Sequence, residues 1–256
     1  MSKIRMKVLV PILCCGALLC SVLGTLMVAG GVTAIRQDQP TGVDAILERD
    51  GYLVRMQGGA VISHRQDRQF TIEAEDKTFA QKQALAAAVA EMIADGQTLF
   101  LNSGTTTVHI AQALKCRKHL NIVTNSLAVA MELGNTATFH VLLLGGEINA
   151  VYGFTSGGDT QEQLGKYRAD WAILSVDGIS AQSGVTTYHP EEAIIDRMMK
   201  ANARSCLIAA TGNKIGRAGF THICDCDSSI QLITDSTCEK EAFRELLNAG
   251  VQISKV

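Results

Sequence analysis

Short apolar runs alternate with amphipathic stretches from residue 81 to the end of the chain, and this alternation limits the folds that the chain can adopt. The apolar runs are predicted as strands: 98–101, 121–124, 139–144, 171–176, 206–210, 231–234 and 251–254. The stretches beside them are predicted as helices: 81–93, 106–114, 127–133, 160–167, 191–203 and 239–247. Buried strands that alternate with helices favour an α/β fold, with a doubly wound, mostly parallel sheet that is covered on both faces.

Small or polar residues follow nearly every predicted strand. They occupy positions 102–104, 124–126, 145–147, 177–178 and 211–214. In an open parallel sheet the carboxyl ends of the strands share one edge, and ligands bind there where the strand order reverses. The sequence therefore predicts a ligand site at this edge.

The segment from Ser103 to Thr107, Ser-Gly-Thr-Thr-Thr, stands between a predicted strand and a predicted helix. Such a turn leaves the first backbone N–H groups of the helix unpaired, and the helix dipole adds partial positive charge beside them. The hydroxyl groups add further donors. This pattern indicates a phosphate site; an ordinary turn with a Ser or Thr cap is the alternative.

Other residues of the same edge suit a small phosphorylated sugar or polyol. Lys214 offers a point charge for the phosphate, and Asp177 and Asn125 offer groups for sugar hydroxyls. Each has a structural alternative: Asp177-Gly178 as a tight turn, Asn125 as a helix cap and Lys214 as a solvated loop residue.

Composition bears on partners and location. The net charge of −2 argues against strong non-specific binding of nucleic acid, so any DNA contact needs a local basic patch. Among the eight cysteines, Cys224 and Cys226 form a C-x-C pair with no second pair at zinc spacing. We therefore expect no metal, no cofactor, and free thiols in a reducing cytoplasm.

Residues 8–35 contain no charged side chain and follow Lys3, Arg5 and Lys7. The length is sufficient to span a bilayer, with the basic flank on the cytoplasmic side. It exceeds the apolar part of a signal peptide, which is typically about 7–15 residues. A membrane anchor over residues 8–30 and a buried or aberrant segment are both open interpretations.

Several motifs occur in a fixed order between residues 77 and 256: LFLNSGTTT, LNIVTNSLAVAMEL, VLLLGGEI, WAILSVDGIS, EEAIIDRMM and TGNKIGR. In this order they resemble the sensor domain of DeoR/GlpR-type sugar-operon repressors. The resemblance implies a fold like that of ribose-5-phosphate isomerase, a homo-oligomer, and a phosphorylated sugar or polyol effector that releases the repressor from operator DNA. It also implies effector contacts from Ser103, Gly104, Thr105, Thr106, Thr107, Thr124, Asn125, Ser126, Gly145, Gly146, Asp177, Gly178 and Lys214.

An isomerase is the enzymatic alternative. Proton transfer between sugar carbons needs a positioned carboxylate base. Where isomerases of that fold have D-G-A-D-E, this chain has D-G-I-S-A at residues 177–181, without the later carboxylates. We therefore predict a binding module and no enzyme activity.

The family resemblance also places a winged helix-turn-helix at residues 1–62 and a linker at 63–76, before the sensor domain at 77–256. Residues 47–60 resemble the wing, and residues 32–38 resemble a distorted recognition-helix segment. In an intact version Thr33 and Arg36 approach the major groove and Arg55 approaches a phosphate.

The N-terminal region departs from the family pattern at two points. The apolar run replaces the first two helices, and Pro40 interrupts the recognition helix. We interpret this region as a damaged or misread coding segment, such as a compensated frameshift; a membrane-tethered sensor is the competing hypothesis. Translation of the other reading frames over codons 8–45 tests the first interpretation.

Overall fold

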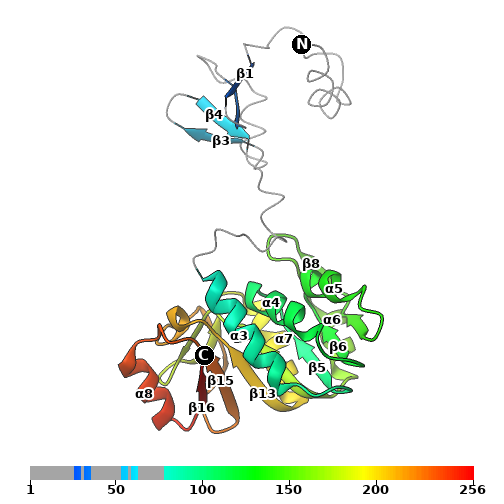
Figure 1. Ribbon diagram of the computed structural model, residues 1–256, viewed down its shortest axis with the longest axis vertical. Helices are drawn as coiled ribbons and strands as arrows, with labels where there is room; N and C mark the ends of the chain where they lie inside the picture. The colour runs from blue at the N-terminus through cyan, green and yellow to red at the C-terminus, as the bar shows by residue number, and fades with distance from the viewer. Residues whose placement is uncertain (1–25, 30–31, 36–52, 57–58, 63–77) are drawn as a thin grey trace. The chain divides into compact units, whose positions relative to one another are not determined.

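The computed structural model describes residues 26–29, 32–35, 53–56, 59–62 and 78–256. The chain divides into two compact units, Met1–Arg68 and Gln69–Val256, which are described separately (Figure 1). Within the described residues, no helix has both the length and the apolar character needed to cross a membrane.

The larger unit is built on a seven-stranded parallel sheet with the strand order β16-β15-β13-β10-β5-β6-β7. Every neighbouring pair in this sheet is parallel. The strands are β5 (Thr98–Leu101), β6 (Asn121–Thr124), β7 (His140–Leu143), β10 (Ala169–Leu174), β13 (Ala203–Ala209), β15 (Ile230–Thr234) and β16 (Gln252–Lys255).

Helices cover both faces of this sheet. They are α3 (Phe79–Met92), α4 (Thr105–Leu114), α5 (Leu127–Leu133), α6 (Gly158–Gly165), α7 (Pro190–Ala201) and α8 (Lys240–Asn248). One hydrophobic core joins α3, α4 and α5 to the sheet, and a second joins α6, α7 and α8 to the opposite face (Figure 1). Along β5, Leu99 and Leu101 enter the first core and Phe100 enters the second, because successive side chains of a strand point to opposite faces.

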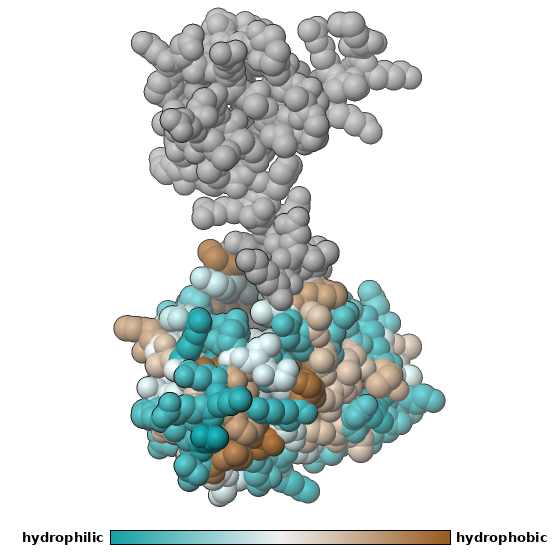
Figure 2. Space-filling view, turned by 60° about the vertical axis from the view of Figure 1, so that its left-hand side comes forward, coloured by the Kyte–Doolittle hydropathy of each residue, from teal (hydrophilic) through white to brown (hydrophobic). Residues whose placement is uncertain are grey.

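Two small antiparallel sheets and a short 3₁₀ helix complete this unit. One sheet contains β11 (Gly178–Ser180), β12 (Gly184–Thr187) and β14 (Thr221–Cys224), and the other contains β8 (Glu147–Asn149) and β9 (Phe154–Ser156). The 3₁₀ helix η1 (Gly212–Lys214) follows β13. On the face that Figure 2 shows, hydrophilic residues are interrupted by separate groups of hydrophobic ones.

The predicted α/β fold is confirmed. Most helices and strands begin and end within two residues of their predicted bounds. The strand predicted at 171–176 starts earlier, because Ala169 pairs with Ala203, and it ends at Leu174. Beyond Leu174 the backbone of Ser175 is held by a side chain: its N–H donates to Asn102 Oδ1 at 2.9 Å, and its carbonyl accepts from Asn102 Nδ2 at 2.9 Å.

The described part of the smaller unit is an antiparallel sheet with the order β1-β2-β4-β3. Its strands are β1 (Leu26–Ala29), β2 (Val32–Ile35), β3 (Leu53–Met56) and β4 (Gly59–Ile62). Strands β1 and β2 lie within the apolar segment 8–35, whose residues 8–25 are outside the described residues. Strands β3 and β4 overlap the segment expected to form a wing.

The expectation of a recognition-helix segment at 32–38 is wrong over Val32–Ile35, which is a strand. The β-branched side chains of Val32, Thr33 and Ile35 favour extended backbone, and β2 pairs with both β1 and β4. Thr33 therefore does not lie on a helix; Arg55 lies on β3 opposite Ala60. Arg36 is outside the described residues.

Candidate functional site

The order of the large sheet reverses at β5. From β5 the chain continues outward through β6 and β7 on one side, and then returns to add β10, β13, β15 and β16 on the other. The loops that follow β5 and β10 therefore meet at the switch point, which is where open parallel sheets bind ligands. These two loops carry Ser103 and Asp177.

The loop after β5 depends on a glycine. Gly104 has a φ of 137°, a region that residues with a Cβ rarely adopt, and a Cβ at this position would lie 2.9 Å from Ser175 Oγ. This conformation brings the loop against the end of β10 and starts α4 at the next residue. Gly104 and Thr105 are exposed, so a ligand has access to them.

The start of α4 offers donors for an anion. The backbone N–H groups of Thr105, Thr106 and Thr107 lie in the first turn, where no helical carbonyl precedes them, and this turn contains no acidic residue. Lys82 of α3 donates from Nζ to Thr105 Oγ1 at 2.7 Å. The loop thus has a cation beside it in addition to the helix dipole. The hydroxyl of Thr107 has a structural role, because it donates to the Gly104 carbonyl at 2.8 Å.

A continuous chain of hydrogen bonds joins this loop to the predicted lysine. Ser103 Oγ donates to Glu192 Oε1, and Glu192 Oε2 lies 2.8 Å from Thr187 Oγ1. Thr187 Oγ1 lies 3.1 Å from Asp177 Oδ2, and Asp177 Oδ1 accepts from Lys214 Nζ at 3.3 Å. The structure therefore brings Ser103, Asp177 and Lys214 into one connected group.

A buried carboxylate pair lies behind this chain, on α7. Asp196 is 1% exposed, and its Oδ1 accepts from Asn102 Nδ2 at 3.0 Å. Burial raises the pKa of Asp196 well above its usual range, and the neighbouring Glu192 raises it further. Burial also raises the pKa of Glu192, against the lowering effect of its hydrogen bonds with Ser103 and Thr187. Both carboxyl groups are therefore biased toward the neutral form.

The polar groups that follow β6 mostly stabilise the local fold. Ser126 Oγ accepts from the Val129 N–H at 3.3 Å and caps α5, so the alternative that Asn125 caps this helix is wrong. Thr124 Oγ1 accepts from the Ser126 N–H at 3.0 Å. Asn125 Nδ2 donates to the Thr155 carbonyl at 3.2 Å, while its buried Oδ1 has no hydrogen-bond partner among the described residues.

The loop after β7 is packed against α6. The Gly145 N–H donates to Gln163 Oε1 at 3.0 Å, so this donor already has a protein partner. Gly146 has a φ of 142°, and a Cβ there would lie 2.1 Å from Thr160 Oγ1. Gly178 likewise has a structural partner, since it opens β11 opposite Thr186.

Four residues of this site were not predicted from the sequence: Lys82, Thr187, Glu192 and Asp196. Two of them carried a signal. Glu192 and Asp196 are four residues apart, so they lie on one face of α7. That face is the buried one, with Ala193, Ile195 and Met199, and acidic residues on a buried helix face point to a specific role.

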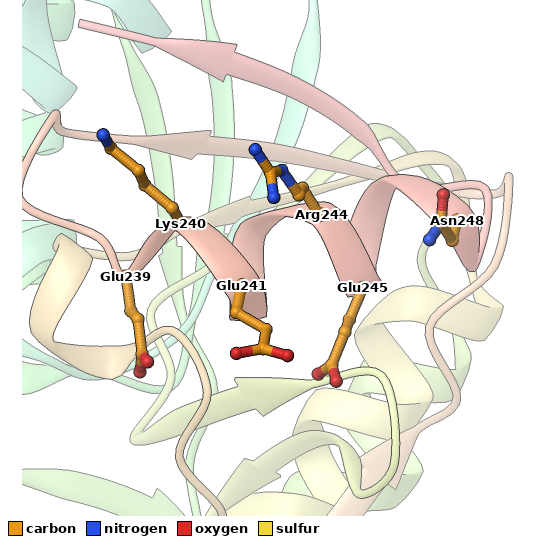
Figure 3. Close-up of a pocket in the computed structure, with 6 residues that line it drawn as sticks. All are labelled: Glu239, Lys240, Glu241, Arg244, Glu245 and Asn248. Carbon is orange, nitrogen blue, oxygen red and sulfur yellow. The ribbon is translucent and has the colours of Figure 1, made fainter.

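An open depression lies elsewhere, on the solvent-facing side of α8. It has a volume of about 540 Å³ and is lined by Glu239, Lys240, Glu241, Arg244, Glu245 and Asn248. Figure 3 shows the three glutamates pointing to one side of the helix and the two basic residues to the other. These side chains do not converge on a ligand position. Within the described part of the chain, no three His, Cys, Asp or Glu residues are grouped to hold a metal ion.

Comparison with known proteins places the site in a family context. Residues 77–236 match the DeoR C-terminal sensor domain. The transcriptional repressor CsqR of Escherichia coli K12 is 31% identical over 207 residues, which cover 81% of this chain and 79% of that protein. The lactose phosphotransferase system repressor of Lactococcus lactis is 30% identical over 203 residues, covering 78% and 79%.

The glycerol-3-phosphate regulon repressor of Escherichia coli K12 is 29% identical over 173 residues, which cover 68% of this chain and 69% of that protein. Among solved structures, ribose 5-phosphate isomerase from Methanocaldococcus jannaschii is 12% identical, with a TM-score of 0.40 and coverage of 54% of this chain and 55% of the other. No functional conclusion follows from a structural likeness at that score.

Proposed function

This chain belongs to the DeoR family of transcriptional regulators, and on that premise we propose that it represses a carbohydrate-utilisation operon until a phosphorylated sugar or polyol binds its sensor domain. The observation that carries the proposal is the connected group from Ser103 to Lys214 at the switch point of the sheet. It lies within the residues that match the sensor domain.

The two ends of this group suit the two ends of such an effector. The phosphate is assigned to the exposed turn at Gly104 and Thr105, where the first N–H groups of α4 and the ammonium group of Lys82 supply positive charge. The hydroxyl groups are assigned to Asp177 and Lys214, which are both partly exposed. This changes the expectation that Lys214 binds the phosphate, because its ammonium group pairs with Asp177 at 3.3 Å. A carboxylate accepts hydrogen bonds from hydroxyls, and an ammonium donates to them.

The assignments at Thr124 to Ser126 and at Gly145 and Gly146 are weaker parts of the proposal. Most of their polar groups already have protein partners. The buried Oδ1 of Asn125 is the exception, and it is the group of this set that we assign to a ligand contact.

Absence of catalysis is also part of the proposal. The relatives named above are repressors. Glu192 is a buried carboxyl that could serve as a base, although its sequence position differs from that of the isomerase carboxylates. We expect no turnover of pentose phosphates by the purified chain; turnover that Glu192→Ala abolishes would establish an enzyme instead.

Operator binding and oligomer formation are proposed from the family alone. Half-sites on DNA are usually read by oligomers with matching symmetry. Arg55 on β3 is retained as a candidate phosphate contact, and Arg36 as a candidate base contact.

The test is a thermal-shift screen of the full chain against phosphorylated sugars and polyols. A compound that binds only the folded state raises the melting temperature. Each compound is paired with its unphosphorylated form and with inorganic phosphate alone. We expect a rise for at least one phosphorylated compound and none for its unphosphorylated partner; no rise across the panel contradicts the proposal.

DNA binding is measured separately, by selection of bound fragments from a pool of double-stranded DNA and by gel shift of the enriched fragment. We expect the compound from the screen to release the fragment. Effector binding without any enriched fragment would leave a sensor that no longer acts on DNA.

A further inference from the structure

Thr187 lies between two carboxyl groups but has only one hydroxyl hydrogen. Its Oγ1 is 2.8 Å from Glu192 Oε2 and 3.1 Å from Asp177 Oδ2. Asp177 Oδ2 also accepts from the Tyr188 N–H at 3.1 Å, and its Oδ1 faces Lys214. Both carboxyl oxygens of Asp177 therefore already act as acceptors toward other donors. One more hydrogen is needed for both contacts of Thr187 to be full hydrogen bonds.

Glu192 is the group that can supply this hydrogen. It is 8% exposed, and burial disfavours its charged form. If its Oε2 carries the proton, Glu192 donates to Thr187, Thr187 donates to Asp177, and Ser103 still donates to Glu192 Oε1. Each of these three hydrogens then has one acceptor in the series of hydrogen bonds.

The charged and titratable groups that act on Glu192 come from several elements. Asp177, between β10 and β11, raises its pKa, while His189 at the start of α7 lowers it. Asp196 lies one turn further along α7, where Glu192 raises its pKa. Lys214 of η1 reaches Glu192 only through Asp177. Loss of the proton would leave Glu192 and Asp177 as two like charges that share one hydroxyl.

We propose that Glu192 is a positioning residue of the effector site, whose neutral carboxyl group joins the anion loop after β5 to Asp177 in one hydrogen-bonded chain. This inference rests on the function proposed above for the same site. It assigns Ser103 to the support of the loop, because its hydroxyl is already used by Glu192. It also makes effector binding dependent on a proton that the protein holds.

The experiment compares Glu192→Gln with Glu191→Gln in the full chain. A glutamine can keep both contacts, with its Oε1 accepting from Ser103 and its Nε2 donating to Thr187, so it reproduces the neutral form at every pH. Glu191 is an exposed neighbour in the same turn, so its variant controls for the change in charge.

The first measurement needs no ligand. A carboxyl group whose pKa is raised by folding stabilises the protein at low pH, and that contribution is lost as pH rises through the raised pKa. We therefore expect the melting temperature of Glu192→Gln, relative to that of the unaltered chain, to increase as pH rises from the ordinary carboxyl range through the raised pKa of Glu192, and to change no further above it. Glu191→Gln should not show this trend.

The second measurement uses the phosphorylated compound found in the thermal-shift screen. Its affinity for the unaltered chain should fall by about tenfold as Glu192 loses its proton, whereas Glu192→Gln should retain the low-pH affinity. Ionisation of the ligand is common to all variants, and Glu191→Gln records it.

Identical pH profiles for Glu192→Gln and the unaltered chain, in both measurements, would overturn the inference without affecting the proposed function. A screen in which no phosphorylated compound binds contradicts the proposed function, and the ligand-free measurement then still decides the protonation of Glu192. If Glu192→Gln does not fold, infrared spectra of Asp196→Asn recorded across the same pH range decide whether Glu192 is neutral, because this variant removes the other buried carboxyl group of α7.

Discussion

Helices α4 and α7 begin at the same edge of the sheet, yet their first turns have opposite chemistry. The first turn of α4 consists of Thr105, Thr106 and Thr107 and contains no acidic residue. The first turn of α7 follows Pro190 and contains Glu191 and Glu192. Because the dipole of a helix favours negative charge at its N-terminus, α7 meets that preference with an acidic side chain of its own, the exposed Glu191. The N-terminus of α4 is left for an anion from outside.

This difference explains how one edge can hold both ends of an effector. The α4 side is exposed at Gly104 and has Lys82 beside it. The α7 side is closed, because Glu192 is buried and bonded to Ser103 and Thr187. Under the proposed function, the phosphate of the effector would meet donors on one side, and its hydroxyl groups would meet Asp177 and Lys214 on the other.

Gly104→Ala is expected to have the largest effect on stability and on effector affinity, because it alters the backbone of the α4 side, called the open side below. A residue with a Cβ in this conformation costs about 1–3 kcal/mol, and the new methyl would also meet Ser175 Oγ at 2.9 Å. The melting temperature should fall by roughly 2–4 °C for each kcal/mol lost. Affinity for the phosphorylated effector should fall at least ~10-fold, equivalent to about 1.4 kcal/mol.

Gly165→Ala is the matched control. Gly165 ends α6, is exposed, and a Cβ there would meet no atom within 4 Å. Alanine is favoured over glycine in a helix by about 1 kcal/mol, so this variant should be neutral or slightly more stable. Equal loss of effector affinity in both variants would show that the α4 turn has no special role.

Lys82→Ala tests the charge of the open side without altering the backbone. Its ammonium group donates to Thr105, at the first residue of α4. We expect the affinity for every phosphorylated compound to fall by ~10-fold, or about 1.4 kcal/mol, and the loss to shrink as added salt screens the charge. Isothermal titration at two salt concentrations measures both effects.

Lys166→Ala serves as the control for that experiment, because Lys166 pairs with Glu162 on the exposed surface of α6. It should leave effector affinity unchanged. If the affinity lost in Lys82→Ala varied with the sugar and did not depend on the phosphate, the phosphate would have to bind elsewhere.

The open side could be predicted from the sequence because its parts are adjacent in the chain. Ser103 to Thr107 lie between the end of β5 and the first turn of α4, and the alternating pattern is sufficient to locate both elements. The closed side could not be predicted in the same way. Glu192 bonds to Ser103 across 89 positions of the chain, so only the folded sheet brings them together.

The expectation of a recognition helix is wrong over Val32–Ile35 for a different reason. It rests on family resemblance, whereas Val32, Thr33 and Ile35 have strong strand propensity. Local propensity and strand pairing agree at β2, and they outweigh the position that the segment occupies in the family pattern. Lys82 could not be predicted as a site residue, because nothing in a regular helix pattern marks one lysine among several polar residues.

The smallest effect is expected from Ser126→Ala, which extends the comparison to a third helix of the same edge. The N-terminus of α5 is capped by its own residue, since Ser126 Oγ accepts from the Val129 N–H. Loss of such a cap costs about 1 kcal/mol, which corresponds to a fall of roughly 2–4 °C in the melting temperature. Effector affinity should be unchanged, because the hydroxyl already has a protein partner.

Ser229→Ala, in an exposed turn where the hydroxyl donates to Asp227, is the control and should have a smaller effect. If Ser126→Ala lost more free energy of effector binding than free energy of unfolding, the effector site would extend to α5, and α4 would be one of two open helix ends.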